Sequence, residues 1–171
     1  MDNAAVELKT LRMASNVSLR RVKEAVIVFL VRKITMETGT PRERVGSVIA
    51  RWGGLITAIG GIDGVETIVI LQVLVAFSLA CQRGNDAPSL EQSLCAKETR
   101  YQALFGQLLA AFYQEDIVEE ADVRAWHVMP ESNGRGALPT SLASSLENSW
   151  AIGSRMIEQF DAQDTGSEES E

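Results

Sequence analysis

Residues 67–81 read TIVILQVLVAFSLAC, and this apolar run decides the fold. It is interrupted by Gln72 and is shorter than the roughly 20 residues that an α-helix needs to cross a bilayer. The run therefore predicts a helix at the centre of a core. A second apolar stretch, EAVIVFLV at residues 24–31, covers only about two helical turns between charged flanks, so it is also expected in the core.

The segments before this run have helical periodicity, and no stretch of the chain alternates cleanly with a period of two. The pattern predicts a first helix over residues 3–14. Ser18 is expected to cap a second helix over residues 19–37. In that helix a set of residues recurs at three- and four-residue intervals, which is typical of a buried face: Val22, Ala25, Val26, Phe29, Leu30 and Lys33.

A third helix is predicted to begin at Thr40 and Pro41 and to run towards Trp52. Thr40 is a good N-cap, proline suits the first helical position, and Glu43 stands where it completes a capping box. Glycine-rich and polar segments predict the breaks that follow, with the clearest loop at residues 84–89. Further helices are expected at residues 55–59, from 90 or 99 to 113, at 118–128 and at 141–160.

About seven or eight helices without a sheet predict an all-α fold, either a stack of antiparallel helix pairs or an irregular bundle. We favour the stack, because the loops have hairpin-like lengths. The chain has 171 residues, 46% of them hydrophobic, which suffices for one domain, placed at residues 1–164. Residues 165–171 lack apolar anchors and are expected to form a disordered acidic tail.

Charge is divided unevenly along the chain. Residues 1–100 hold 13 Lys or Arg and 10 Asp or Glu, whereas residues 101–171 hold 3 and 13, so the two parts carry +3 and −10. A field of this kind attracts cationic protein segments and repels phosphates. We therefore expect a basic protein partner and no direct contact with nucleic acid.

No cofactor, metal or nucleotide site is predicted. The chain has two cysteines, Cys81 and Cys95, and one histidine, His127, too few for a zinc site, and it has no GKS, GKT or GxSxG motif. His127 is expected to be either a surface residue or a satisfied residue beside Trp126, and covalent catalysis is not expected. The cysteines are interpreted as reduced thiols, and the acidic, amphipathic start does not resemble a signal peptide, so a cytoplasmic protein without a membrane contact is expected.

Residues 112–126 read FYQEDIVEEADVRAW and hold five carboxylates within eight positions. If residues 115–128 formed one helix, the acids would lie opposite the apolar residues, and Trp126 would stand among the acids. An aromatic ring beside carboxylates suits lysine, whose stem packs on the ring while its ammonium pairs with the acids. Alternatively, the acids only favour the dipole of their own helix and form a solvated face. The residues alone leave both interpretations open.

The same stretch closely resembles the acidic-aromatic box of the W2 family of translation-factor C-terminal domains. The acidic end at residues 155–171, RMIEQFDAQDTGSEESE, resembles the second such box. The start, VELKTLRMASNVSLRRVKEAV at residues 6–26, is similar to the opening of the catalytic domains of initiation factor 2B epsilon subunits, which are guanine nucleotide exchange factors.

The resemblance implies a HEAT-like helical fold that promotes GDP release from initiation factor 2 through its gamma subunit, the GTPase, and its lysine-rich beta subunit. It also implies assembly with the other subunits of the exchange factor. The family motif L-E-x-x-T/S-L-R-M places the catalytic glutamate at Glu7, although Val6 stands where relatives often have Leu. The residues implied for partner binding are Tyr113, Asp116, Glu119, Glu120, Asp122, Trp126, Glu158, Phe160, Glu168 and Glu169.

The second box departs from the tryptophan-rich pattern of relatives, because IEQFD has Gln159 and Phe160 there. Either Phe160 takes the aromatic role or the site is weaker. Two other functions remain open. One is a non-catalytic W2 adaptor that docks lysine-rich segments, like the end of initiation factor 5, although VELKTLRM argues against it. The other is a structural helical repeat whose acidic end only aids solubility.

Overall fold

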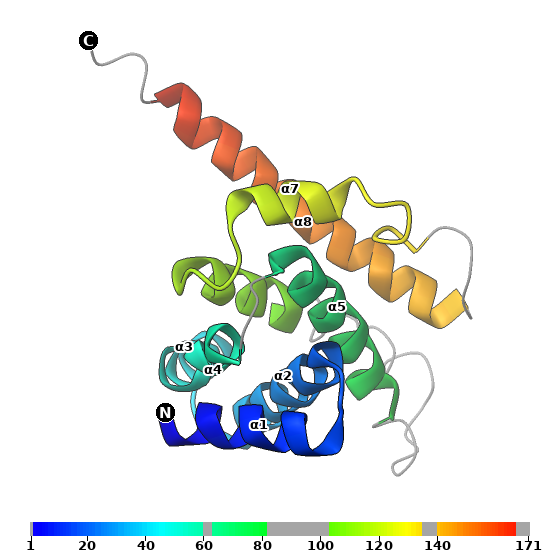
Figure 1. Ribbon diagram of the computed structural model, residues 1–171. Helices are drawn as coiled ribbons and strands as arrows, with labels where there is room; N and C mark the ends of the chain where they lie inside the picture. Colours follow the sequence, from blue (N-terminus) through cyan, green and yellow to red (C-terminus); the bar gives the residue numbers. More distant parts are fainter. Residues whose placement is uncertain (1, 60–62, 82–102, 135–139, 167–171) are drawn as a thin grey trace.

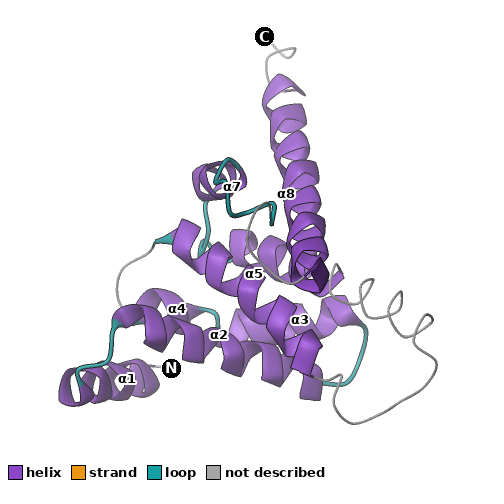
Figure 2. Ribbon diagram, turned by 90° about the vertical axis from the view of Figure 1, so that its right-hand side faces the viewer, coloured by secondary structure: helices purple, strands orange, loops and turns teal. Residues whose placement is uncertain are grey.

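The computed structural model describes residues 2–59, 63–81, 103–134 and 140–166, and within these ranges it contains helices and no strand. The predicted all-α class is confirmed, and the stacked helices agree with a HEAT-like domain of the W2 type (Figures 1 and 2). The helices are α1 (Asp2–Ser15), α2 (Leu19–Met36), α3 (Pro41–Trp52), α4 (Gly54–Ala58), α5 (Gly64–Cys81), a helix over residues 103–114, α7 (Glu120–His127) and α8 (Thr140–Gly166).

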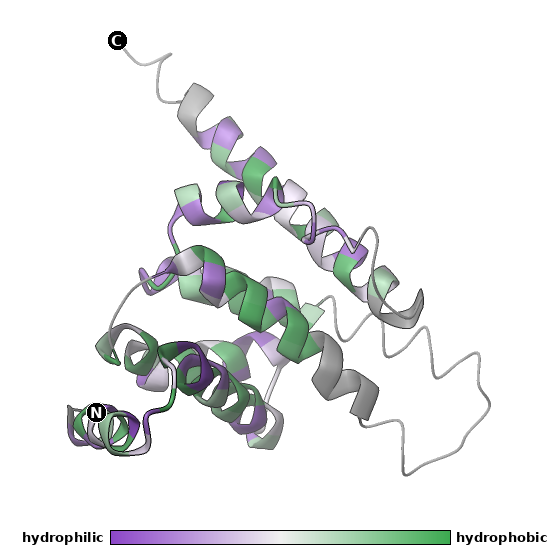
Figure 3. Cartoon of the chain, turned by 45° about the vertical axis from the view of Figure 1, so that its right-hand side comes forward, coloured by the Kyte–Doolittle hydropathy of each residue, from purple (hydrophilic) through white to green (hydrophobic). Residues whose placement is uncertain are grey.

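Helix α5 is the centre of the core, as its apolar sequence predicts. It contacts α2, α7 and α8, and Ile68, Leu71 and Val75 are fully buried. Figure 3 shows its hydrophobic residues running through the middle of the stack. The helix begins at Gly64, three residues before the apolar run. None of the described helices is long and apolar enough to span a membrane.

Helix starts follow local sequence signals. The Ser18 side chain accepts a hydrogen bond from the Arg21 N–H, as expected for the cap of α2. At α3 the Glu43 carboxylate accepts from the Thr40 N–H at 2.9 Å, while the Thr40 hydroxyl accepts from the Glu43 N–H, so the predicted capping box is confirmed. These contacts involve residues three apart, which is why the sequence alone reveals them.

The buried face of α2 overlaps the predicted face but is rotated from it, and Val22 and Phe29 are only partly buried against the core. Val26 and Leu30 are buried as expected, but Ala25 is exposed and Lys23 is buried. The Lys23 ammonium lies 3.0 Å from the carboxylate of Glu66 on α5. Because a buried lysine needs a counter-charge, this pair makes the burial possible, and a pattern that counts lysine as polar misplaces the face.

A polar cluster lies inside the apolar core around Gln72 of α5, which is 2% exposed. The Gln72 amide N–H donates to the Ser132 carbonyl at 2.8 Å and to the Leu146 carbonyl at 3.3 Å. Its amide oxygen accepts from the indole N–H of Trp126 at 3.2 Å. These bonds join α5 to α7, to α8 and to the turn between them.

Helices α7 and α8 are also joined by stacked rings. The His127 ring stacks on Trp150 with centroids 4.3 Å apart, and its Nε2 lies 2.7 Å from the Ser154 hydroxyl. The indole N–H of Trp150 donates to the His127 carbonyl at 2.9 Å. Partial burial lowers the pKa of His127. His127 is thus a satisfied residue beside Trp126, as expected.

Several of the expected boundaries fall at the ends of the described ranges or outside them. Helix α8 continues to Gly166, two residues past the expected end of the domain at 164. The predicted loop at residues 84–89, Cys95 and residues 167–171 lie outside the described residues, as does the expected start of the helix that reaches residue 114.

Two helical glycines make a matched test of this packing. A Cβ at Gly153 of α8 would lie 2.4 Å from the Trp126 ring, so Gly153→Ala is expected to lower the free energy of unfolding by about 1–3 kcal/mol. At Gly46 of α3 a Cβ meets nothing within 4 Å, so Gly46→Ala is expected to raise it by about 0.5–1 kcal/mol. Urea unfolding followed by circular dichroism measures both, and effects of the same sign contradict this packing.

Candidate functional site: an acidic turn and a distant exposed glutamate

The carboxylates of residues 112–126 lie on a turn and a short helix. Asp116 has a left-handed backbone with φ of 53°. The Ile117 N–H donates to the Phe112 carbonyl at 2.9 Å, and the Asp116 N–H donates to the Tyr113 carbonyl at 3.3 Å. This pair of bonds is a Schellman motif that ends the preceding helix, with Phe112 and Ile117 both buried. The premise of one continuous helix over residues 115–128 is therefore wrong, whereas the helix expected over residues 118–128 is present as α7 at Glu120–His127.

Trp126 lies in the core, so its expected position among the acids is also wrong. The side chain has 0% exposure, and its ring lies 5.9 Å from that of Phe105. The turn changes the orientation of α7 from that of one continuous helix. Val123 and Trp126 therefore face the core, while Val128 is 80% exposed. A ring buried in this way has no surface to offer the stem of a partner's lysine.

Asp122 has structural contacts. Its carboxylate accepts a hydrogen bond from the Glu119 N–H at 2.8 Å, at the start of α7. It also lies against Gly64, the first residue of α5, where a Cβ would clash with the Asp122 carboxylate. A negative charge beside the start of two helices is favourable, because both present partly positive N–H groups there. The interpretation that the acids favour helix dipoles thus accounts for Asp122.

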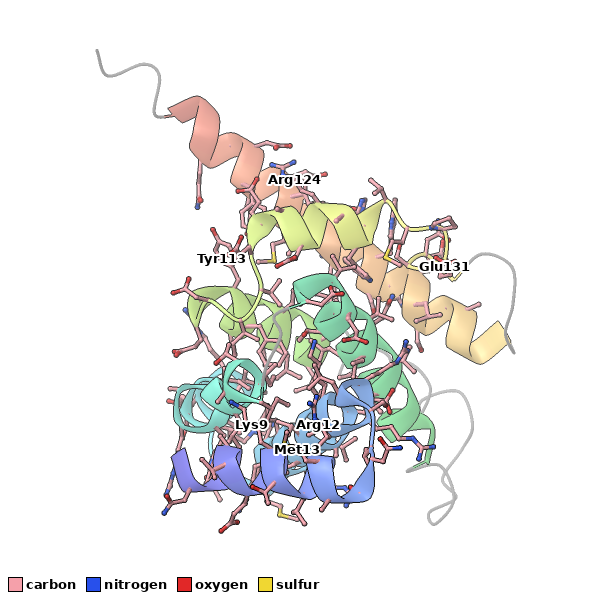
Figure 4. All side chains as sticks on the ribbon, viewed as in Figure 1. Lys9, Arg12, Met13, Tyr113, Arg124 and Glu131 are labelled. Atoms are coloured by element: carbon pink, nitrogen blue, oxygen red, sulfur yellow. The ribbon has the colours of Figure 1, made fainter. Side chains whose placement is uncertain are left out.

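Arg124, which Figure 4 labels near α7 and α8, contacts one carboxylate on each of these helices. Its guanidinium lies 2.6 Å from the Glu120 carboxylate and 2.5 Å from that of Asp161 on α8. Hydrogen bonds to Asp161 and then to Glu120 raise the pKa of Arg124. Glu120 is therefore already paired with a cation of its own chain.

The acids that remain exposed lie on the turn and on α8. Glu115, Asp116 and Glu119 are exposed on the turn, and Glu158 is exposed on α8. Beside the turn, the Tyr113 ring packs 5.0 Å from the ring of Phe160, with Tyr113 37% exposed and Phe160 5% exposed. The structure thus brings the aromatic residues of the two boxes together. Glu168 and Glu169 lie outside the described residues.

Glu7 is exposed on α1 at the other end of the stack. Helix α1 contacts α2 and α4, whereas α7 contacts α5 and α8, and Figures 1 and 2 show the two regions well apart. Near Glu7 in the chain, Val6 is 61% exposed, Leu11 is 63% exposed and Met13 is 80% exposed. The glutamate therefore shares the exposed part of α1 with three large apolar side chains, and it is separate from the acidic turn.

Comparison with known proteins identifies the relationship. The epsilon subunit of translation initiation factor eIF2B from Schizosaccharomyces pombe is 32% identical over 133 residues, which is 78% of this chain. The chain is an eIF2B-epsilon-related domain. It spans 17% of the length of that curated relative. No family model matches the chain, and no solved structure matches it.

Sequence reasoning missed two contributors to the acidic region of this eIF2B-epsilon-related domain. Arg124 could have been found, because Glu120 and Arg124 stand four apart on one helix, a spacing that favours ion pairs. Asp161 could not, because its contact with Arg124 joins residues 37 apart in the chain.

The turn provides a test that separates backbone strain from charge. Asp116→Gly is expected to raise the free energy of unfolding by about 0.5–1 kcal/mol, because glycine adopts a left-handed conformation without a Cβ penalty. Asp116→Ala removes the same carboxylate but keeps the Cβ, so it is expected to give no such gain. Equal stabilities of the two variants in urea unfolding would mean that the turn is not strained at this residue.

Proposed function

We propose that this domain promotes GDP release from translation initiation factor 2. The proposal rests on the similarity to an eIF2B epsilon subunit and on Glu7, which lies within VELKTLRM and is exposed beside large apolar side chains. The exposed apolar surface is the observation that carries it. Folding gains nothing from placing Val6, Leu11 and Met13 in water, whereas a partner protein gains from covering them.

In this proposal α1 contacts the gamma subunit, the GTPase, and Glu7 acts on the nucleotide site. Its carboxylate competes for a lysine or Mg²⁺ that holds GDP, or it reorients a switch loop. No bond is made or broken by the domain. Exchange requires only that the domain binds the nucleotide-free GTPase more tightly than the GDP-bound form.

The acidic turn is proposed to bind the lysine-rich beta subunit. Asp116 and Glu119 are exposed on the turn and supply carboxylates, and Tyr113 beside them supplies an aromatic surface for lysine stems. Glu158 supplies a further exposed carboxylate from another side of α8. Glu120 and Asp122 already contact residues of this chain, and they add negative charge near the binding surface. Trp126 holds α7 in place. Glu168 and Glu169 extend the surface in the proposal, which also includes assembly with other exchange-factor subunits in the cytoplasm.

Replacing Glu7 tests the exchange activity. Glu7→Gln is expected to slow domain-stimulated GDP release from initiation factor 2 at least tenfold, because the amide cannot compete as an anion. The release of fluorescent GDP measures the rate. Glu37→Gln, an exposed change at the end of α2, serves as the control and should leave the rate unchanged. A parent domain that binds the beta subunit without changing GDP release would instead be an adaptor.

Charge reversal tests the lysine-rich partner. Glu119→Lys combined with Glu158→Lys is expected to weaken binding of a lysine-rich beta-subunit peptide at least tenfold at low salt, and the parent affinity should fall as salt rises. Fluorescence anisotropy measures both effects. The control, Glu131→Lys with Glu147→Lys, changes the net charge equally at other exposed positions. Equal losses in both double variants, or binding indifferent to salt, would contradict docking at the turn.

A further inference from the structure

A groove of about 400 Å³ lies between the 103–114 helix and α8. The two helices run in the same direction, because Gly106 faces Ile152 and Tyr113 faces Phe160. The residues that α8 contributes recur at three- and four-residue intervals, the spacing of a helix seam: Ile152, Arg155, Met156, Gln159, Phe160 and Gln163. Among the residues that the structure describes, no third helix fills this seam, so the groove resembles an open helix packing site.

A second groove of about 380 Å³ lies on the other side of the 103–114 helix, against α3. Both grooves share Gly106, Ala110 and Gln114. Gly106 and Ala110 are four residues apart and lie between the grooves, where a large side chain would separate them. Small residues at this spacing allow the backbone of another helix to approach closely, with its side chains entering the grooves on either side.

The charge of this face differs from that of the rest of the C-terminal region. The charged residues that line the grooves are Arg42 and Arg155, and neither forms an ion pair with a described residue. At about 100° per residue, Glu147, Glu158 and Asp161 lie on the opposite side of α8. Asp161 indeed contacts Arg124 of α7. Helix α8 thus separates an acidic side from a side that carries glutamines and arginine.

We propose that this face binds an amphipathic helix of a partner protein that carries carboxylates beside its apolar seam. Apolar side chains of the partner fill the two grooves, and its Asp or Glu side chains pair with Arg42 and Arg155. A second copy docked by the same face would bring its own Arg42 and Arg155 to the contact, so charge complementarity favours an acidic helix over a second copy. The face is separate from Glu7 and adjoins the acidic turn at Tyr113, which lines the first groove. It differs from the turn in charge, because its charged residues are arginines, so it suits an acidic segment where the turn suits a lysine-rich one.

A displayed library of helical peptides tests the proposal. Leu and Ala are fixed along one seam, and the flanking positions vary among Glu, Asp, Lys, Arg and Gln. Peptides that bind the parent domain are selected, and those that also bind an Ala110→Leu variant are removed, because leucine fills the groove. The remaining peptides are groove binders, and sequencing gives their flanking charges.

The expected result is a carboxylate-to-cation ratio at least threefold above that of the unselected library. Arg42→Glu with Arg155→Glu should then weaken these peptides at least tenfold in anisotropy measurements, while Arg20→Glu with Arg32→Glu, at exposed positions on α2, should not. Circular dichroism verifies folding of each variant. The proposal is overturned if no groove binders remain, if they favour cations, or if sedimentation shows a dimer that Ala110→Leu disrupts.

Discussion

The buried amide of Gln72 is the constraint on which the C-terminal half depends. It satisfies the Trp126 indole and the Ser132 and Leu146 carbonyls at once, and so holds α5, α7, α8 and the turn between them in one arrangement. An unsatisfied buried polar group costs about 1–3 kcal/mol of stability. An alternative packing of these helices would break several of these hydrogen bonds at once, so it would carry this cost several times. A purely apolar α5 would bury equal area without specifying where α7 must lie.

Fixing Trp126 inward determines where the acids lie. Helix α7 has only eight residues, so once Val123 and Trp126 face the core, Ala125 faces solvent and Asp122, four residues before Trp126, lies near the start of α5. Glu119 precedes the helix in an extended conformation and is exposed. Gly153 completes this geometry, because only a residue without a side chain lets α8 approach the Trp126 ring. The packing of α8 against the buried Trp126 ring thus fixes the position of the acidic turn.

The sequence predicts the features that depend on neighbours a few residues away. Caps, helix positions and the central role of α5 are of this kind, since Ser18 with Arg21 and Thr40 with Glu43 are local pairs. The sequence does not predict the position of a residue whose burial depends on a partner far away in the chain. Lys23 becomes a core residue only because Glu66, 43 positions away, neutralises it, and Trp126 only because Gln72, 54 positions away, accepts its N–H. The Schellman turn was missed because Asp116 stands where glycine usually signals it.

The same turn indicates how the domain balances stability against its charge. Glycine at position 116 would suit the backbone better, yet an aspartate occupies it and adds a carboxylate to an already acidic region. Arg124 reduces the resulting repulsion, because it bridges Glu120 of α7 and Asp161 of α8 at the point where the two helices meet. Internal cations thus neutralise the acids that hold helices together, while the acids of the turn stay exposed. The turn thus keeps a left-handed aspartate next to exposed carboxylates, an arrangement that stability alone does not favour and that the proposed cationic partner would use.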